Sequence, residues 1–350
     1  MKRSITLLAS AVFLFLSCDK VSNGAGDDED FNPGVKTLNV TDISHSSATF
    51  NGKLNIPEQI AADFDFGFEL CTSENFEEES TTHYSVGTYL ASDMTFQYKV
   101  DNSLKPLQTY YVRAYMLNSK CLYYGAVMRF QTSDFTPDFV DLGLSVKWAT
   151  CNVGAFSPQG YGDYFAWGET EPYYNDDSQN PTGWKSGKSS GYIWSSYKYC
   201  KGSYDTMTKY CNNSSDDYNG FTDGKTVLDP EDDVAHVNWG GDWRMPTKAE
   251  FDELRNTSNC TWTWTTVNGV NGYKVVSKKS GYEGNYIFLP AAGCRDGTDL
   301  NYVGSGGIYW SSSLYTDYPS YAYNLGFNSS SYRTSYYGRD DGTSVRPVCP

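Results

Sequence analysis

The residue types best suited to molecular recognition are concentrated near the carboxyl end of the chain. Residues 313–341 read SLYTDYPSYAYNLGFNSSSYRTSYYGRDD, and Tyr, Ser, Asn and Asp account for 18 of these 29 residues. Exposed tyrosine rings offer a large contact area at a small entropic cost, and Ser, Asn and Asp offer adaptable hydrogen bonds. This composition is typical of antibody-type binding surfaces and predicts a binding site. The alternative is a tyrosine-rich surface without a dedicated ligand.

We expect Leu325 and Phe327 to anchor this stretch in the core and most of the other side chains to face outward. Stacking on aromatic rings and hydrogen bonds from the amide and guanidinium groups would then supply the affinity. The expected ligand is an extracellular protein or a glycan. The predicted ligand-binding residues are Tyr315, Tyr318, Tyr323, Asn324, Tyr332, Arg333, Tyr336, Tyr337 and Arg339.

Patterns of catalytic or metal-binding residues are scarce in the rest of the sequence. The histidines His45, His83 and His236 occupy separate settings, and neither an HExxH nor a GxSxG motif occurs. We therefore predict no catalytic residue, no metal site and no cofactor. Residues 215–226 loosely follow the spacing of a calcium loop, but Thr226 replaces the closing glutamate. A polar surface turn is the alternative for this stretch.

Two helices are predicted between residues 228 and 255. Asp229 is a good N-cap, Pro230 suits the first helical position, and Gly240 ends the first helix. Thr247, followed three residues later by Glu250, forms a capping box for the second helix.

Strands and one long irregular segment complete this half of the chain. Residues 171–227 are rich in Gly, Ser, Asn, Asp and Tyr, and we expect Trp184, Trp194 and Tyr197 to fold them against the body. Cys200 and Cys211 could either form a disulfide that holds this segment or remain free thiols. The predicted strands are 141–148, 272–277, 286–289, 308–312, 321–328 and 343–348.

An ordered string of motifs in this half resembles the Fib_succ_major paralogous domain. The motifs are VDLGLSVKWATCNVG (140–154), IFLPAAG (287–293), YWSSS (309–313) and SVRPV (344–348), together with the helical stretch 228–255. The resemblance covers residues 138–350 and implies an α+β, C-type-lectin-like fold, which does not fix a ligand. The position of 313–341 also resembles the variable region of diversity-generating retroelement target proteins. Formylglycine-generating enzymes have a related fold and use a closely spaced cysteine pair, whereas Cys294 and Cys349 are far apart in this sequence.

Residues 34–133 show the short alternating strands of an all-β sandwich. Alternating apolar residues predict strands at 48–54, 64–70, 109–116 and 123–132. The stretch LKPLQTYYVRAY (104–115) resembles the entry to strand F of fibronectin type III domains. The resemblance makes Tyr110 the corner tyrosine, whose hydroxyl bonds to upstream backbone, and implies a spacer or partner-binding module.

The amino terminus resembles that of a bacterial lipoprotein. Residues 1–17 combine a basic start with an apolar run, as in a signal peptide. The pattern LSC ending at Cys18 resembles a lipobox, which implies acylation of Cys18 and anchoring in the membrane. Residues 18–33 are polar and acidic, and we expect a disordered tether there. The net charge of −15 argues against nucleic acid as a partner.

Taken together, these observations predict a surface lipoprotein on the outer membrane of a Gram-negative bacterium. It would have a lipid anchor, a tether, a fibronectin-like spacer and a lectin-like tip, and it would act as a non-enzymatic binding protein or adhesin. One alternative is a structural subunit or tip of a surface appendage, and another is an enzyme of the formylglycine-generating kind.

Overall fold

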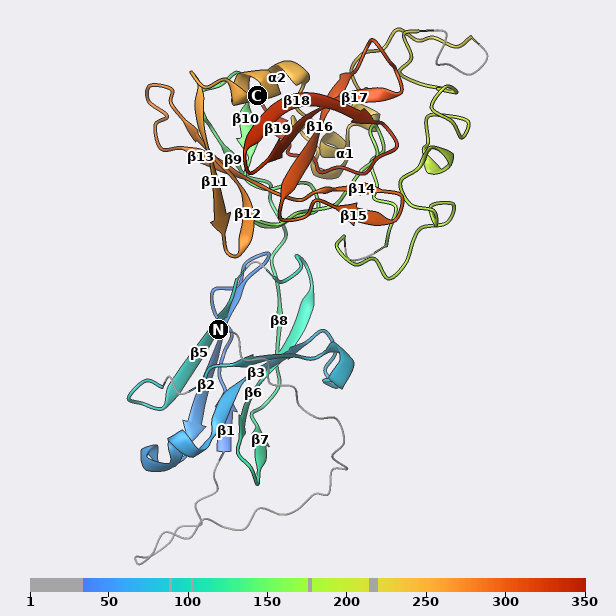
Figure 1. Cartoon of the computed structure of the whole chain (residues 1–350). Helices are drawn as coiled ribbons and strands as arrows, with labels where there is room; N and C mark the ends of the chain where they lie inside the picture. Colours follow the sequence, from blue (N-terminus) through green and yellow to red (C-terminus); the bar gives the residue numbers. More distant parts are fainter. Residues whose placement is uncertain (1–33, 88–89, 102, 176–177, 214–219) are drawn as a thin grey trace, which may run out of the picture. The chain divides into compact units, whose positions relative to one another are not determined.

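The computed structural model describes residues 34–87, 90–101, 103–175, 178–213 and 220–350. The predictions for the signal peptide, Cys18 and the tether therefore lie outside the described residues. The chain divides into two compact units, Met1–Asp134 and Phe135–Pro350. Most of the regular structure in both units is β-sheet (Figure 1). Two short α-helices occur among the described residues, so the predicted α+β class is not confirmed.

The first unit is a β-sandwich with the strand order of a fibronectin type III-like fold. One sheet has the order β1-β2-β5, and the other has the order β4-β3-β6-β7 with β8 also paired to β6. Two 3-10 helices, Glu58–Asp63 and Glu78–Ser80, lie between strands. The strands are β1 Gly34–Thr37, β2 Ala48–Asn55, β3 Asp65–Cys71, β4 Thr82–Ser85, β5 Thr95–Val100, β6 Thr109–Leu117, β7 Leu122–Tyr124 and β8 Met128–Gln131.

The sandwich core and its corner agree with the sequence pattern. Phe66 and Phe68 alternate inward from β3 and are almost fully buried. The Tyr110 hydroxyl accepts a hydrogen bond from the Lys105 backbone N–H at 2.9 Å, which confirms the predicted tyrosine corner. The strand predicted over 123–132 is instead divided into β7 and β8.

The second unit contains several small antiparallel sheets, drawn in green to red in Figure 1. The sheet orders are β19-β10-β9, β11-β12-β13, β14-β15 and β16-β17-β18. The strands are β9 Phe139–Val140, β10 Lys147–Ala149, β11 Cys260–Val267, β12 Val270–Ser277, β13 Tyr286–Pro290, β14 Cys294–Asp296, β15 Asp299–Asn301, β16 Gly306–Leu314, β17 Tyr321–Asn328, β18 Ser331–Gly338 and β19 Val348–Cys349. The strands β9, β11, β14, β15 and β18 were not predicted. The strands predicted over 141–148 and 343–348 are reduced to β10 and β19.

The two helices begin at different kinds of cap. Helix α2 (Lys248–Arg255) has the predicted capping box between Thr247 and Glu250. Helix α1 (Val234–Trp239) begins at Asp233, whose carboxylate accepts from the backbone N–H groups of residues 235 and 236, and it ends at Gly240. Asp229 occupies an N-cap position followed by Pro230, as predicted, but the helix that begins there is a 3-10 helix rather than α1, and the Asp229 side chain makes no capping hydrogen bond. Residues 230–232 form a 3-10 turn, and the Asp229 carboxylate instead pairs with Lys209 and Lys225.

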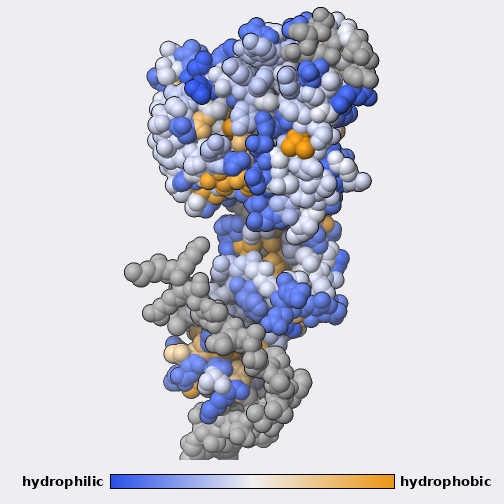
Figure 2. All heavy atoms as spheres, turned by 45° about the vertical axis from the view of Figure 1, so that its right-hand side comes forward, coloured by the Kyte–Doolittle hydropathy of each residue, from blue (hydrophilic) through white to orange (hydrophobic). Residues whose placement is uncertain are grey.

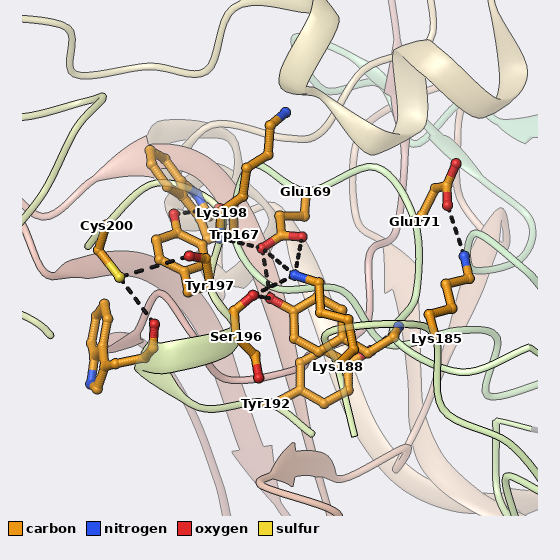
Figure 3. A network of polar contacts seen from close by, with 12 residues as sticks. Trp167, Glu169, Glu171, Lys185, Lys188, Tyr192, Ser196, Tyr197, Lys198 and Cys200 are labelled. Atoms are coloured by element: carbon orange, nitrogen blue, oxygen red, sulfur yellow. Dashed lines mark hydrogen bonds and ion pairs between the residues drawn. The ribbon is translucent and has the colours of Figure 1, made fainter. Parts of the chain in front are cut away.

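Polar side chains hold the irregular segment 171–227 in place (Figure 3). Glu169 is buried and accepts hydrogen bonds from the Tyr173 hydroxyl at 2.6 Å, Lys188 Nζ at 2.9 Å and the Lys198 backbone N–H at 2.8 Å. The Lys188 ammonium also lies 3.7 Å from the centre of the Tyr173 ring. Charge-assisted hydrogen bonds of this kind are stronger than neutral ones. They fix a segment whose described residues form very little helix or strand.

Aromatic side chains of the segment 171–227 pack against the hydrophobic core of the second unit. Tyr197 is buried, and Trp184 and Trp194 pack on the same core cluster, as predicted. The Tyr197 hydroxyl donates to the Trp167 backbone oxygen at 2.7 Å. Cys200 is a free thiol with its sulfur 3.1 Å from the Trp194 carbonyl, so it forms no disulfide with Cys211.

Hydrophobic residues are dispersed over the surface that Figure 2 shows. They appear there as small separate patches among hydrophilic residues. Among the described residues, no helix is long and apolar enough to cross a membrane.

Candidate binding surface

The β16-β17-β18 sheet positions the tyrosine-rich residues. Strands β17 and β18 pair with Tyr323 opposite Tyr336, Leu325 opposite Thr334 and Phe327 opposite Tyr332. Because side chains alternate across a strand, these residues share one face of the sheet. Helix α2 packs on the β16-β17-β18 sheet (Figure 1).

This face changes character along the strands. At one end Leu325 and Phe327 enter the core, as predicted. In the middle, the Thr334 hydroxyl donates to the Asp252 carboxylate of α2 at 2.6 Å. At the other end Tyr323 and Tyr336 remain partly exposed. The most exposed aromatic side chains of this face therefore lie at its other end, beyond the helix.

Five aromatic side chains meet at that exposed end and form what we call the tyrosine cluster. Tyr315 is stacked on Tyr336 with ring centres 4.2 Å apart, and on Tyr318 with ring centres 6.2 Å apart. Tyr323 meets Tyr315 edge-on at 5.2 Å, and Tyr321 meets Tyr336 edge-on at 5.5 Å. Tyr318, Tyr321 and Tyr336 are 59%, 38% and 47% exposed. The cluster is thus packed within itself and still open to solvent.

Charged side chains flank the tyrosine cluster. The Lys248 ammonium lies 5.3 Å from the Tyr323 ring centre and forms an ion pair with Asp252 at 2.6 Å. Desolvation, followed by hydrogen bonding to the Asp317 carboxylate, raises the pKa of Tyr315. At neutral pH the Tyr315 hydroxyl therefore stays protonated and can donate a hydrogen bond.

Three other predicted ligand-binding residues lie away from the tyrosine cluster. Tyr332 is half-buried and stacks on Trp262 with ring centres 4.5 Å apart. Tyr337 points to the opposite face of the sheet, where its hydroxyl lies 3.9 Å from the Cys294 sulfur and burial raises its pKa. Arg333 is exposed but also belongs to the opposite face.

The prediction of Asn324 and Arg339 as ligand-binding residues is wrong, because both side chains are buried. Asn324 is 2% exposed on the inward face of β17, and Arg339 is fully buried. The Arg339 guanidinium donates to the backbone oxygens of Lys209 at 3.0 Å and Pro319 at 2.9 Å. It also donates to the Tyr210 backbone oxygen at 3.2 Å and, through Nε, to the Tyr197 hydroxyl at 2.9 Å, so it satisfies several polar groups in the interior. Arg339 is therefore a structural residue.

Tyr321 belongs to the tyrosine cluster but was not predicted as a ligand-binding residue. The sequence could have predicted the position of Tyr321, because Leu325 was expected to point inward. Counting back from Leu325 by twos places Tyr323 and Tyr321 on one face of the strand.

The strongest candidate for a metal site among the described residues is already filled by a lysine. Asp229, Glu231 and Asp232 have carboxylates close enough together to hold an ion. The Lys209 ammonium lies 2.9 Å from Asp229, 3.6 Å from Glu231 and 2.5 Å from Asp232. Its positive charge takes the place that a cation would need, so these residues form an ion-pair network.

The calcium-loop pattern is only partly covered by the structure. Residues 214–219 lie outside the described residues. Asp223 is described, and its carboxylate accepts backbone hydrogen bonds from Tyr210 at 2.8 Å and Cys211 at 3.0 Å. Asp223 therefore has a turn-capping role.

Comparisons with known proteins identify one domain and several β-domain structures. Residues 264–348 match a domain of unknown function, DUF8237. No curated protein matches the sequence. This DUF8237 match includes β16, β17 and β18, which carry most of the tyrosine cluster.

The similar solved structures share little sequence with this chain. The sensor domain of the anti-sigma factor RsgI4 from Pseudobacteroides cellulosolvens is 14% identical, with 29% of this chain and 95% of that domain covered and a TM-score of 0.23. A human fibronectin type III domain, from fibronectin type III domain containing protein 3, is 16% identical, with 35% and 98% covered and a TM-score of 0.21. These similarities are too weak to support an inference about function.

Proposed function

We propose that this protein is a non-enzymatic binding protein that holds its ligand on the tyrosine cluster. The observation that carries the proposal is a group of five packed tyrosines, three of them exposed and two half-buried, at the end of an ordered β-ladder. Rigid aromatic side chains lose little entropy on binding, and clusters of them act as binding hot spots.

The packing within the tyrosine cluster favours a protein over a glycan as the ligand. Tyr315 is stacked with both Tyr318 and Tyr336, so much of the ring face in the cluster is used internally. A sugar ring binds an aromatic side chain by stacking on a free ring face. A protein surface can instead use ring edges and hydroxyl groups, which combine apolar contact with hydrogen bonds. We therefore propose an extracellular protein as the ligand.

The roles proposed for the other segments, and the proposed location of the protein, are based on the sequence. The fibronectin-like unit would act as a spacer, and the second unit would be a C-type-lectin-like domain of the Fib_succ_major kind. Acylated Cys18 would anchor the chain in the outer membrane, with both units outside the cell. The alternative role, a structural subunit of a surface appendage, would require stable association with another envelope protein.

One observation disfavours the enzymatic alternative. Formylglycine-generating enzymes need reactive thiols, and the thiolate is the reactive form of cysteine. Cys294 is buried, and burial raises its pKa to about 11. Its thiol therefore stays protonated at neutral pH.

The experiment compares two variants in a screen against extracellular proteins and a glycan array. The test variant replaces Tyr318, Tyr321 and Tyr336 with Ala, and the control replaces two exposed tyrosines elsewhere, Tyr204 and Tyr286. We expect the test variant to lose binding to a protein ligand while keeping the melting temperature of the wild type, and the control to bind normally. Unchanged binding by the test variant would refute the proposal. Binding to glycans alone would refute the choice of ligand class.

A further inference from the structure

The first unit contains a hollow of about 510 Å³. Most of its lining residues belong to the β1-β2-β5 sheet of Figure 1 or to the stretch that follows β1. The volume falls in the range of small-molecule sites, roughly 300–1,000 Å³. Three threonines and three residues with carboxamide side chains are among the ten lining residues, and none of the ten is charged. The hollow is therefore large enough for a small ligand and is polar without being charged.

Carboxamide side chains form a connected row across this sheet. Asn51 and Gln97 are opposite each other in the ladder between β2 and β5. They lie on the outer face of the sheet, because the neighbouring Phe50 is fully buried in the core. Asn51 Oδ1 accepts a hydrogen bond from Gln97 Nε2 at 2.8 Å. Asn51 Nδ2 donates to the Asn39 carbonyl at 2.8 Å and to Thr41 Oγ1 at 3.2 Å, so the Asn51 amide is engaged at both ends and holds Gln97 in place.

Two carboxamide residues of the hollow keep unused hydrogen-bonding groups. Gln97 Oε1 and the side-chain amide of Asn39 have no hydrogen-bond partner among the described residues, and both residues are exposed. A carboxamide combines an acceptor oxygen with two N–H donors. Leu38 and Met128 also line the hollow, and both are half-buried. The hollow therefore offers donors, acceptors and apolar surface together.

The lack of charge in the described lining limits the class of ligand. The Asp93 carboxylate lies outside the lining and accepts hydrogen bonds from the Thr95 hydroxyl at 2.6 Å and the Thr95 backbone N–H at 3.1 Å. A charged ligand would lose hydration in the hollow without gaining an opposite charge, which is unfavourable. A neutral ligand rich in hydroxyl groups is favoured, because each hydroxyl can donate to a carboxamide oxygen or accept from a carboxamide N–H.

We propose that this hollow binds a neutral oligosaccharide. A sugar has hydroxyl groups around the edge of its ring and C–H groups on its faces. The hydroxyl groups match the free amide groups of Asn39 and Gln97, and the C–H groups match the apolar side chains of Leu38 and Met128. The fibronectin-like unit would then have a binding site of its own. The proposal does not rest on the proposed ligand of the tyrosine cluster, which belongs to the other unit.

The experiment screens the full chain on an array of neutral and acidic oligosaccharides and measures the dissociation constant of the best neutral one by isothermal titration calorimetry. The test variant is Asn39→Ala/Gln97→Ala. The control, Gln59→Ala/Asn75→Ala, removes the same two residue types from exposed positions of the same unit outside the hollow. We expect the wild type and the control to bind alike, and the test variant to bind about tenfold more weakly, because it lacks the free amide groups. All four positions are exposed, so both variants should keep the wild-type melting temperature.

Three results would overturn the proposal. One is the absence of binding to every neutral oligosaccharide at about 10 mM, a concentration that would detect even a very weak complex. Another is binding that is confined to acidic oligosaccharides. The third is a test variant that binds as tightly as the wild type.

The tyrosine-cluster variant separates this site from the proposed protein-binding site. Binding of neutral oligosaccharides that persists when Tyr318, Tyr321 and Tyr336 are replaced by Ala would support the hollow as the site. Binding that is lost in that variant would place the sugar on the tyrosine cluster and overturn the proposal.

Discussion

Replacing Arg339 by Met should destabilise the second unit strongly, although Arg339 looks like a surface binding residue in the sequence. The guanidinium is fully buried and donates to the backbone oxygens of Lys209, Tyr210 and Pro319. Met fills a similar volume but provides no donor. The substitution therefore leaves three carbonyl oxygens in the interior without this partner.

The size of the effect follows from these contacts. Each buried polar group that loses its partner costs about 1–3 kcal/mol. Three carbonyls at the lower end of this range give a loss of about 3 kcal/mol in the free energy of unfolding. The lower end is appropriate because Met also avoids the cost of burying a guanidinium charge.

The matched control is Arg333→Met on the neighbouring strand β18. Arg333 is exposed, and substitutions at exposed positions usually change stability by less than about 0.5 kcal/mol. Urea unfolding followed by tryptophan fluorescence is a suitable assay, because all nine tryptophans lie after residue 147 and report only the second unit. A loss below about 1 kcal/mol for Arg339→Met, or equal losses for both variants, would refute the structural role of Arg339.

The structure supports three further predictions. Because the pKa values of Asp340 and Asp341 are raised to about 7 and about 8 from 3.8, the folded chain binds protons more tightly than the unfolded chain. The stability should therefore fall as the pH rises from about 4 to about 8, and thermal melts of Asp340→Asn/Asp341→Asn should show a flatter pH profile. Thr247→Ala removes the N-cap of α2 and should cost about 1 kcal/mol in urea unfolding, whereas Thr247→Ser should cost much less. Tyr110→Phe removes the acceptor of the Lys105 N–H and should cost about 0.5–1.5 kcal/mol of sandwich stability, measured by far-UV circular dichroism; no loss would contradict the corner role.

Local patterns in the sequence predicted the elements whose formation depends on local interactions. The capping box at Thr247 and the corner hydroxyl of Tyr110 involve partners within a few residues, and both were found. Strand β17 was predicted with its observed bounds because apolar and polar residues alternate along it. Strand β11, CTWTWTTV, was missed even though Thr and Trp alternate there, because no clearly apolar run marks it.

The residues whose roles were predicted wrongly make contacts with residues far away in the sequence. Asp229 has the right residue type for a cap, but its carboxylate forms an ion pair with Lys209, 20 positions earlier, instead of capping backbone N–H groups. Arg339 was expected to face solvent because charged residues are rarely buried. Two of its carbonyl partners, Lys209 and Tyr210, lie 130 and 129 residues earlier, and no local sequence pattern indicates that contact. Strand β18 was not predicted because its residues are mostly polar and show no apolar alternation.

The way the chain holds its tyrosines has an evolutionary consequence. In the segment 171–227, side-chain groups such as the Tyr197 hydroxyl and the Glu169 carboxylate maintain the fold, so few substitutions there would be tolerated. The tyrosine cluster instead stands largely on a β-ladder joined through main-chain atoms, which every residue type except proline can supply. New specificities could therefore arise at these positions by mutation while the architecture beneath them stays the same.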